Sequence, residues 1–75
     1  MSDYSNLIVE AMKYIDEKIE KINPNSVNKS RLHNKINIEI VANIKKIALL
    51  KPTDAYKTID DIYNTQLLEE LLRHI

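Results

Sequence analysis

The 75-residue chain contains no cysteine and no glycine. Without cysteine it forms no disulfide and no thiolate metal site. Without glycine it holds no phosphate-binding loop, dinucleotide-binding turn or strained nucleophile elbow, because each of these needs the conformational freedom of glycine. Tight β-hairpins also depend largely on glycine, so the composition favours helices over a sheet.

Aromatic residues and long apolar stretches are scarce as well. Four tyrosines are the only aromatic residues, and no apolar run approaches the roughly 20 residues that span a bilayer. The first residues lack a basic stretch followed by an apolar one, so we expect no signal peptide, no membrane partner and a cytoplasmic location.

A chain of this length buries only about 60% of the surface that its unfolded form exposes. Small folds are usually reinforced by disulfides, a metal ion or a partner chain. Because cysteine is absent, association with another chain is the expected additional source of stability.

Charge is balanced overall, with 11 basic and 11 acidic residues, but it is unevenly distributed. Residues 26–51 contain one acid, Glu39, and six bases, which are Lys29, Arg31, Lys35, Lys45, Lys46 and Lys51. Acidic outer helices around a basic middle helix explain this distribution, and so does a surface for nucleic acid.

Apolar spacing predicts an all-α fold, a small three-helix bundle that forms a single domain over residues 1–75. The first helix is expected over residues 3–22, capped by Ser2 or Asp3 and stopped by Pro24. Residues at three- and four-residue spacing define its buried face, namely Tyr4, Ile8, Ala11, Ile15, Ile19 and Ile22.

The second helix is expected over residues 27–50, capped by Ser26 or Ser30 and ended by Pro52. Its core stripe contains Leu32, Ile36, Ile40, Val41, Ile44, Ile47 and Ala48. A second stripe follows on the far side at heptad-like spacing and contains Arg31, Lys35, Ile38, Ala42, Lys45 and Leu49. Either three helices cover the core and these apolar residues are simply exposed, or this stripe meets another chain.

The third helix is expected over residues 54–75, capped by Thr53. Its first half carries an apolar face of Ala55, Ile59, Ile62 and Tyr63. From Leu67 onward the stripe changes to Leu67, Leu68, Leu71, Leu72 and Ile75, whose centre lies more than 100° away. This offset favours a break near residues 64–65, and the alternative is a continuous helix whose last turns face something different.

The ionisable residues show no convergent catalytic or metal-binding pattern. His33 and His74 are the only histidines, and no spacing supplies the three or four ligands of a metal site. His74 follows Glu70 by four residues, as in exposed helical pairs. Asp60 and Asp61 are adjacent and diverge by about 100° on a helix. We therefore expect no enzyme, no metal ion and no cofactor.

The leading hypothesis is a small non-enzymatic regulatory or adaptor protein that acts through helix-mediated protein–protein contact. It forms a homo-oligomer, a dimer at its simplest, binds a larger protein, or does both. Modulators encoded by phages and mobile elements are often proteins of this kind. The residues expected to contact a partner are Tyr14, Ile38, Ala42, Lys45, Leu49, Leu68 and Leu72.

The alternative hypothesis is a DNA- or RNA-binding regulator. The start of the second helix is rich in donors and poor in acids, and a helix N-terminus there favours phosphate. Arginine can read guanine and asparagine can read adenine. The residues expected to contact nucleic acid are Asn28, Lys29, Arg31, His33, Asn34 and Lys35.

Overall fold

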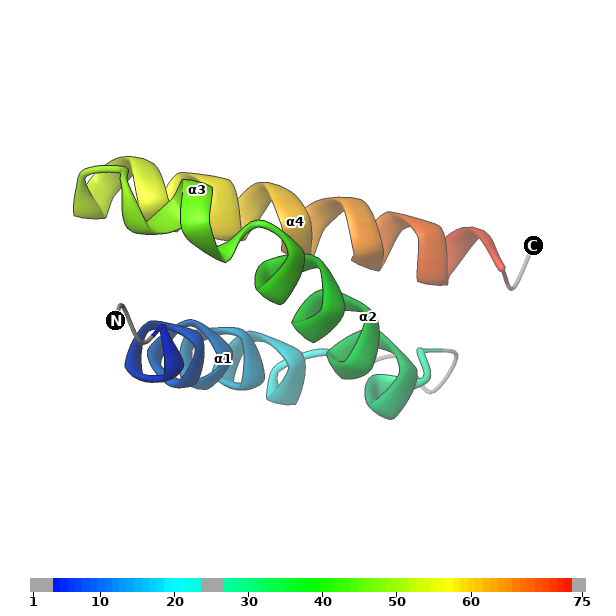
Figure 1. Ribbon diagram of the computed structural model, residues 1–75. Helices are drawn as coiled ribbons and strands as arrows, with labels where there is room; N and C mark the ends of the chain where they lie inside the picture. Colours follow the sequence, from blue (N-terminus) through cyan, green and yellow to red (C-terminus); the bar gives the residue numbers. More distant parts are fainter. Residues whose placement is uncertain (1–3, 24–26, 74–75) are drawn as a thin grey trace.

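The computed structural model describes residues 4–23 and 27–73, and its regular elements there are all helices. They are α1 (Ser5–Glu20), α2 (Lys29–Ala42), α3 (Ile44–Ala48) and α4 (Pro52–Leu72). In Figure 1, α4 runs most of the length of the molecule, the shorter α1 runs in the same direction along its left half, and the α2–α3 segment returns diagonally between them. The molecule is elongated, with extents of 43 × 18 × 16 Å. The prediction of an all-α fold is confirmed.

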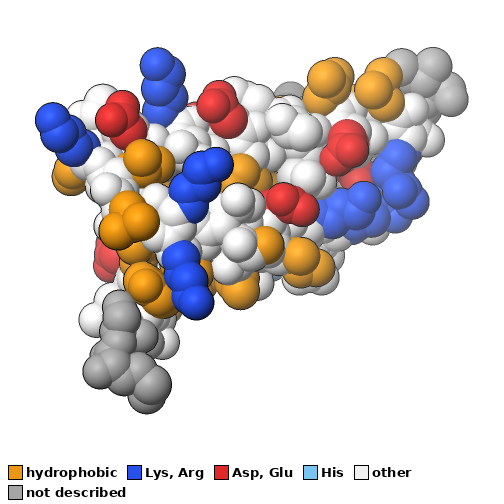
Figure 2. Space-filling view, turned by 45° about the horizontal axis from the view of Figure 1, so that its top comes forward, with side chains coloured by type: hydrophobic (Ala, Val, Ile, Leu, Met, Phe, Trp, Pro, Cys, Tyr) orange, Lys and Arg blue, Asp and Glu red, His pale blue; other side chains and the backbone are white. Residues whose placement is uncertain are grey.

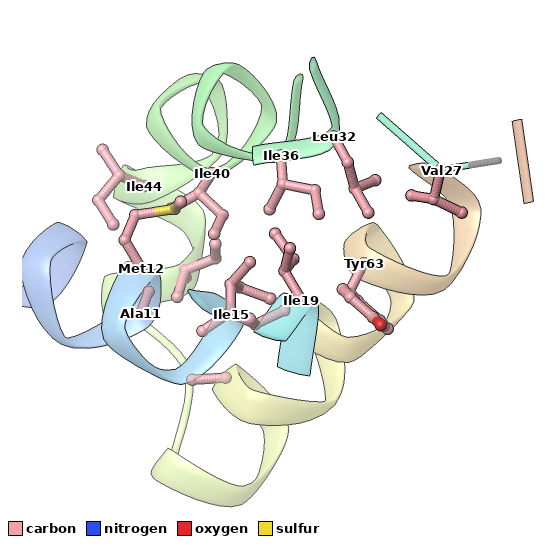
Figure 3. Close-up of a cluster of buried hydrophobic side chains, with 13 residues drawn as sticks. Ala11, Met12, Ile15, Ile19, Val27, Leu32, Ile36, Ile40, Ile44 and Tyr63 are labelled. Carbon is pink, nitrogen blue, oxygen red and sulfur yellow. The ribbon is translucent and has the colours of Figure 1, made fainter. Parts of the chain in front are cut away.

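The core is aliphatic and draws on every helix. Its most deeply buried side chains are Ile15, Leu32, Ile36, Ile40, Ile47 and Ile59. Figure 3 shows Ile15 and Ile19 of α1 pointing toward Leu32 and Ile36 of α2, with Tyr63 of α4 beside them. Burial of each large aliphatic side chain stabilises the fold by roughly 1.5–3 kcal/mol, so this cluster holds the four helices together.

The apolar face predicted for α1 is largely confirmed. Ala11, Ile15 and Ile19 are buried, and the three outer members of the stripe pack against the core with partial exposure. Met12 is also buried, although the predicted stripe omitted it. The predicted caps, Ser2 and Asp3, lie outside the described residues, as do Pro24 and the connection that follows it.

The prediction of one continuous helix over residues 27–50 is wrong, because the segment bends at Asn43. The side-chain amide of Asn43 donates a hydrogen bond to the backbone carbonyl of Glu39 at 2.8 Å. Its backbone N–H also donates to the carbonyls of Glu39 and Ile40, at 3.1 and 3.2 Å. Asparagine competes in this way with regular helical hydrogen bonding. The chain restarts as α3, which buries Ile44 and Ile47. Val41 and Ala48, predicted in the core stripe, are exposed.

The caps of α2 and α4 also differ from the predicted ones. The side chain of Asn28 accepts a hydrogen bond from the backbone N–H of Arg31 at 3.0 Å and so caps α2. Ser30 lies inside that helix, and Ser26 lies outside the described residues. Pro52 is the first residue of α4, where its fixed φ suits a helix start and its missing N–H costs nothing.

α4 is continuous from Pro52 to Leu72, so the favoured break near residues 64–65 does not occur and Thr53 lies inside the helix. Ala55, Ile59 and Tyr63 are buried, as predicted. Glu70 follows Tyr63 by seven residues and is buried too. The inward stripe therefore continues along one face of the helix, but a glutamate takes the place expected for a leucine.

Truncation of the core at Ile36 tests this arrangement. We expect Ile36→Ala to lower the free energy of unfolding by about 2–5 kcal/mol, since it removes buried methyl groups and leaves a cavity. The matched control is Val41→Ala, on the same helix and 46% exposed, which should change stability by no more than about 0.5 kcal/mol. Urea unfolding followed by circular dichroism measures both, and equal losses would contradict this core.

Candidate binding surface

A buried carboxylate joins the start of α2 to the end of α4. Glu70 is only 2% exposed. The guanidinium of Arg31 donates to it twice, from Nε to Oε1 and from Nη2 to Oε2, both at 2.8 Å. The backbone N–H of Asn28 donates to Oε2 at 3.2 Å. This is the paired-fork geometry of a strong arginine–carboxylate interaction.

This contact determines which residues of α4 face outward. Because Glu70 points at α2, helical geometry turns its neighbours on the opposite side of the last turns toward solvent. Leu68 is 58% exposed and Leu72 is 55% exposed. Three leucines of the predicted second stripe, Leu68, Leu71 and Leu72, are therefore exposed, whereas Leu67 is partly buried and packs against the core.

The prediction that Glu70 lies on an exposed face, paired with His74, is wrong because Glu70 faces inward. His74 lies outside the described residues. The signal that could have placed Glu70 was its register, since it continues the inward spacing of Ile59 and Tyr63. Arg31, on a segment almost without acids, was the available partner.

The exposed sides of α2 and α4 border one groove, and we define the α2–α4 face as the residues that line this groove together with Leu72 and Leu68, which lies one turn before Leu72 on the outer side of α4. A shallow groove of about 290 Å³ runs between the helices and is lined by Lys35, Ile38, Glu39, Gln66 and Glu69. Leu72 lies one turn beyond Glu69, so it borders the same groove. Figure 2 shows hydrophobic side chains beside the C-terminal end of α4, with charged side chains next to them.

The structure brings some of the predicted partner-binding residues together and separates others. Ile38 and Ala42 are exposed on α2, which packs against α4 with its exposed Leu68 and Leu72. Lys45 and Leu49 are exposed but lie beyond the bend at Asn43, so the predicted heptad-like stripe does not continue along one straight helix. Whether these residues contact a partner stays a prediction.

Tyr14, the remaining predicted partner contact, is engaged within the chain. Its hydroxyl donates to Asp60 of α4 at 2.6 Å, and its ring packs edge-on against Tyr56 with centroids 4.9 Å apart. The ammonium of Lys18 lies 3.2 Å from the same carboxylate and within 5.2 Å of the rings of Tyr14 and Tyr63. This polar cluster ties α1 to α4.

The contacts in this cluster raise the pKa values of both Tyr14 and Lys18. The hydrogen bond to Asp60, with burial and the charge of that carboxylate, raises the pKa of Tyr14 above its ordinary value. Burial alone would lower the pKa of Lys18, but the hydrogen bond and charge of Asp60 outweigh it and raise that pKa as well. Asp61 points away and lines a different groove, as the adjacency of the two aspartates predicted.

Most of the predicted nucleic-acid contacts are committed to intramolecular bonds. Arg31 binds Glu70, and Asn28 caps α2. Nδ1 of His33 lies 2.6 Å from Asp16, and Lys29 donates to the carbonyl of Glu20 at 3.4 Å. Asn34 is exposed and Lys35 is half-buried. The nucleic-acid hypothesis stays a prediction, and binding by Arg31 or His33 requires breaking these contacts.

Within residues 4–23 and 27–73, no group of three or more His, Cys, Asp or Glu side chains is placed to hold a metal ion. None of the four helices is long and apolar enough to cross a membrane. Comparison of the chain with protein-family models, with curated proteins and with solved structures found no match. The functional argument therefore depends on the geometry of the chain.

Replacement of Glu70 by glutamine tests the buried pair. Glu70→Gln leaves the Arg31 charge without its carboxylate, so we expect the Tm to fall by about 10 °C. The fall is limited because Arg31 is partly exposed and water can solvate its guanidinium. The matched control is Glu69→Gln, which removes an exposed charge one residue away and should change the Tm by less than about 3 °C. Equal effects of the two variants in thermal unfolding would contradict the role of Glu70.

The raised pKa of Tyr14 predicts a loss of stability at alkaline pH. A proton that the folded chain binds more tightly than the unfolded chain adds stability below the unfolded-state pKa of about 10. That stability is lost as the pH rises through the raised pKa of folded Tyr14. In Tyr14→Phe, the free energy of unfolding should therefore fall less steeply above about pH 10. Part of the fall should remain, because burial also raises the pKa of Tyr63. Unfolding measured across this range tests the effect, and an unchanged decline in Tyr14→Phe contradicts it.

Proposed function

We propose that this chain is a small regulatory or adaptor protein that acts by contact with another protein through the α2–α4 face. The observation that carries the proposal is the exposure of three large hydrophobic side chains on two packed helices. Ile38 is 64% exposed, Leu68 58% and Leu72 55%, while the core is complete without them. Apolar residues that share one surface are typical of protein interaction sites.

The charges around these residues fit a specific contact better than a purely apolar one. Lys35 lines the groove together with Glu39 and Glu69, so both signs of charge border the apolar side chains. Polar rims of this kind set orientation and discriminate between partners, whereas buried apolar anchors supply most of the affinity. The groove is shallow and lies on rigid helices, which suits the face of a partner helix.

A second copy of the chain is one occupant, and a larger protein is the other. Self-association would supply the additional stability that a chain of this length needs. A larger partner would make the chain an adaptor or an antagonist of that protein. Both occupants use the same residues, so one set of variants tests the face and a mass measurement separates them.

Light scattering at several concentrations, together with capture from the source cells, tests the proposal. Self-association predicts a mass above 8.8 kDa that Ile38→Asp and Leu68→Asp return to the monomer value. If the wild type is monomeric, capture of its partner should be lost in both variants and should persist after nuclease treatment. The matched control is Val9→Asp, on the outer side of α1 and 56% exposed, which should change neither result.

Two outcomes contradict the proposal. One is a monomer whose captured proteins are the same in Ile38→Asp, Leu68→Asp and Val9→Asp. The other is a partner that nuclease removes and that binds with a steep dependence on salt, as phosphate contacts require. The second outcome favours the nucleic-acid alternative.

A further inference from the structure

Two opposite charges flank the centre of the α2–α4 face. Lys35 and Glu39 lie one turn apart on α2, with Ile38 between them along the helix, and all three line the groove. A lysine that precedes a glutamate by four residues is in the less favourable order for a pair within one helix. Among the residues that the structure describes, the ion pairs involve neither Lys35 nor Glu39. Both charges are therefore available to a partner.

The outer side of α2 is apolar at this point, although the core already occupies its inner side. Leu32, Ile36 and Ile40 of this helix are buried in the core. On the outer side Ile38 is 64% exposed, and Ala42, one turn later, is exposed as well. A small side chain such as alanine lets a neighbouring helix approach closely. α2 therefore offers a short apolar strip that fits a second helix.

The order of the charges selects a second copy of α2 in the antiparallel direction. A two-fold contact brings a surface against itself, so that surface has to be self-complementary. An antiparallel α2 centred midway between the two charges places Lys35 opposite the partner's Glu39, and Glu39 opposite the partner's Lys35. A parallel copy in register places like charges opposite each other, and these repel. Glu69 of α4, the other acid that lines the groove, adds to the attraction for the partner's lysine.

We propose that the occupant of the α2–α4 face is a second copy of the chain, bound about a two-fold axis with its α2 antiparallel to this one. The inference rests on the proposed function and names the partner at the same face. Ile38 lies at the centre of the contact and excludes water, while Leu68 and Leu72 of α4 widen the apolar area. Lys35 and Glu39 determine direction and register, because a shifted or parallel alignment separates the opposite charges or brings like charges together.

Charge reversal at each of the two positions tests the proposal on the full chain. The contact is small because α2 has only 14 residues, so sedimentation equilibrium should extend from about 10 μM to about 1 mM. Lys35→Glu sets acid against acid across the axis, and Glu39→Lys sets base against base. We expect each of these variants to dimerise about tenfold more weakly than the wild type. An equimolar mixture of the two should regain the wild-type affinity, because both pairs in the mixed dimer join opposite charges.

Two further variants complete the set. The double variant, Lys35→Glu with Glu39→Lys, keeps both signs in exchanged positions and should dimerise as the wild type does. The matched control is Lys13→Glu, a charge reversal at an exposed residue of α1, which should change the affinity by less than about twofold. Circular dichroism checks that each variant is folded. Recovery in the mixture and in the double variant also excludes misfolding as the cause of the loss in the single variants.

Three outcomes overturn the proposal: a wild type that stays monomeric up to about 1 mM, a Glu39→Lys variant that dimerises as strongly as the wild type, or a mixture that associates no better than its components. The proposed function can hold when this inference fails. A monomeric chain whose capture of a larger protein is lost in Ile38→Asp keeps the α2–α4 face as its contact site and excludes only the second copy. If Ile38→Asp and Leu68→Asp change neither the mass nor the captured proteins, both proposals are wrong.

Discussion

The arrangement of this small fold depends on the contact between Arg31 and Glu70. A buried carboxylate is costly to remove from water, and the cost is offset only when its oxygens are fully hydrogen-bonded. Glu70 meets this condition through two charge-assisted bonds from Arg31 and one from the backbone of Asn28. Within the described residues, every buried side-chain polar atom has such a partner. The pair therefore fixes the start of α2 against the end of α4, and a rotation of α4 would separate it.

This constraint explains why Leu68 and Leu72 remain exposed and do not join the core. If α4 were turned to bury Leu68 and Leu72, Glu70 would leave Arg31 and the inward spacing of Ile59 and Tyr63 would be broken. The exposed leucines are thus a consequence of one polar contact. Their exposure is what makes the α2–α4 face a candidate interaction surface.

Periodicity in the sequence was sufficient for the helical class and for most of the core. Ala11, Ile15 and Ile19 follow from spacing alone, because an amphipathic helix repeats its apolar side every three to four residues. The bend in the middle was not predicted, since Asn43 resembles any polar residue in a stripe until its side chain is seen to bond the carbonyl of Glu39. Spacing locates faces, but it does not show where a side chain competes with the backbone.

The prediction of a break near residues 64–65 was wrong for a related reason. Charged residues usually face solvent, and they are buried only when a partner is buried with them. The leucines from Leu67 onward therefore predicted an apolar stripe that is offset from the earlier one, whereas the buried face continues through Glu70. The partner of Glu70 lies 39 positions away at Arg31, and no local pattern connects two residues at that separation. The candidate surface follows from this long-range pair. The sequence therefore predicted Leu68 and Leu72 as contact residues, but it did not predict which way they face.

Amide hydrogen exchange of the last turns of α4 tests this account most directly. In a variant with Arg31→Met, the carboxylate of Glu70 loses its guanidinium, and the account predicts faster exchange from residue 66 to residue 72, with the turns around Ile59 protected as before. Exchange should slow again when Glu70→Leu is added, because an apolar pair restores burial without a charge. Unchanged protection of residues 66–72 in the single variant would contradict the claim that this pair holds the end of α4 in place.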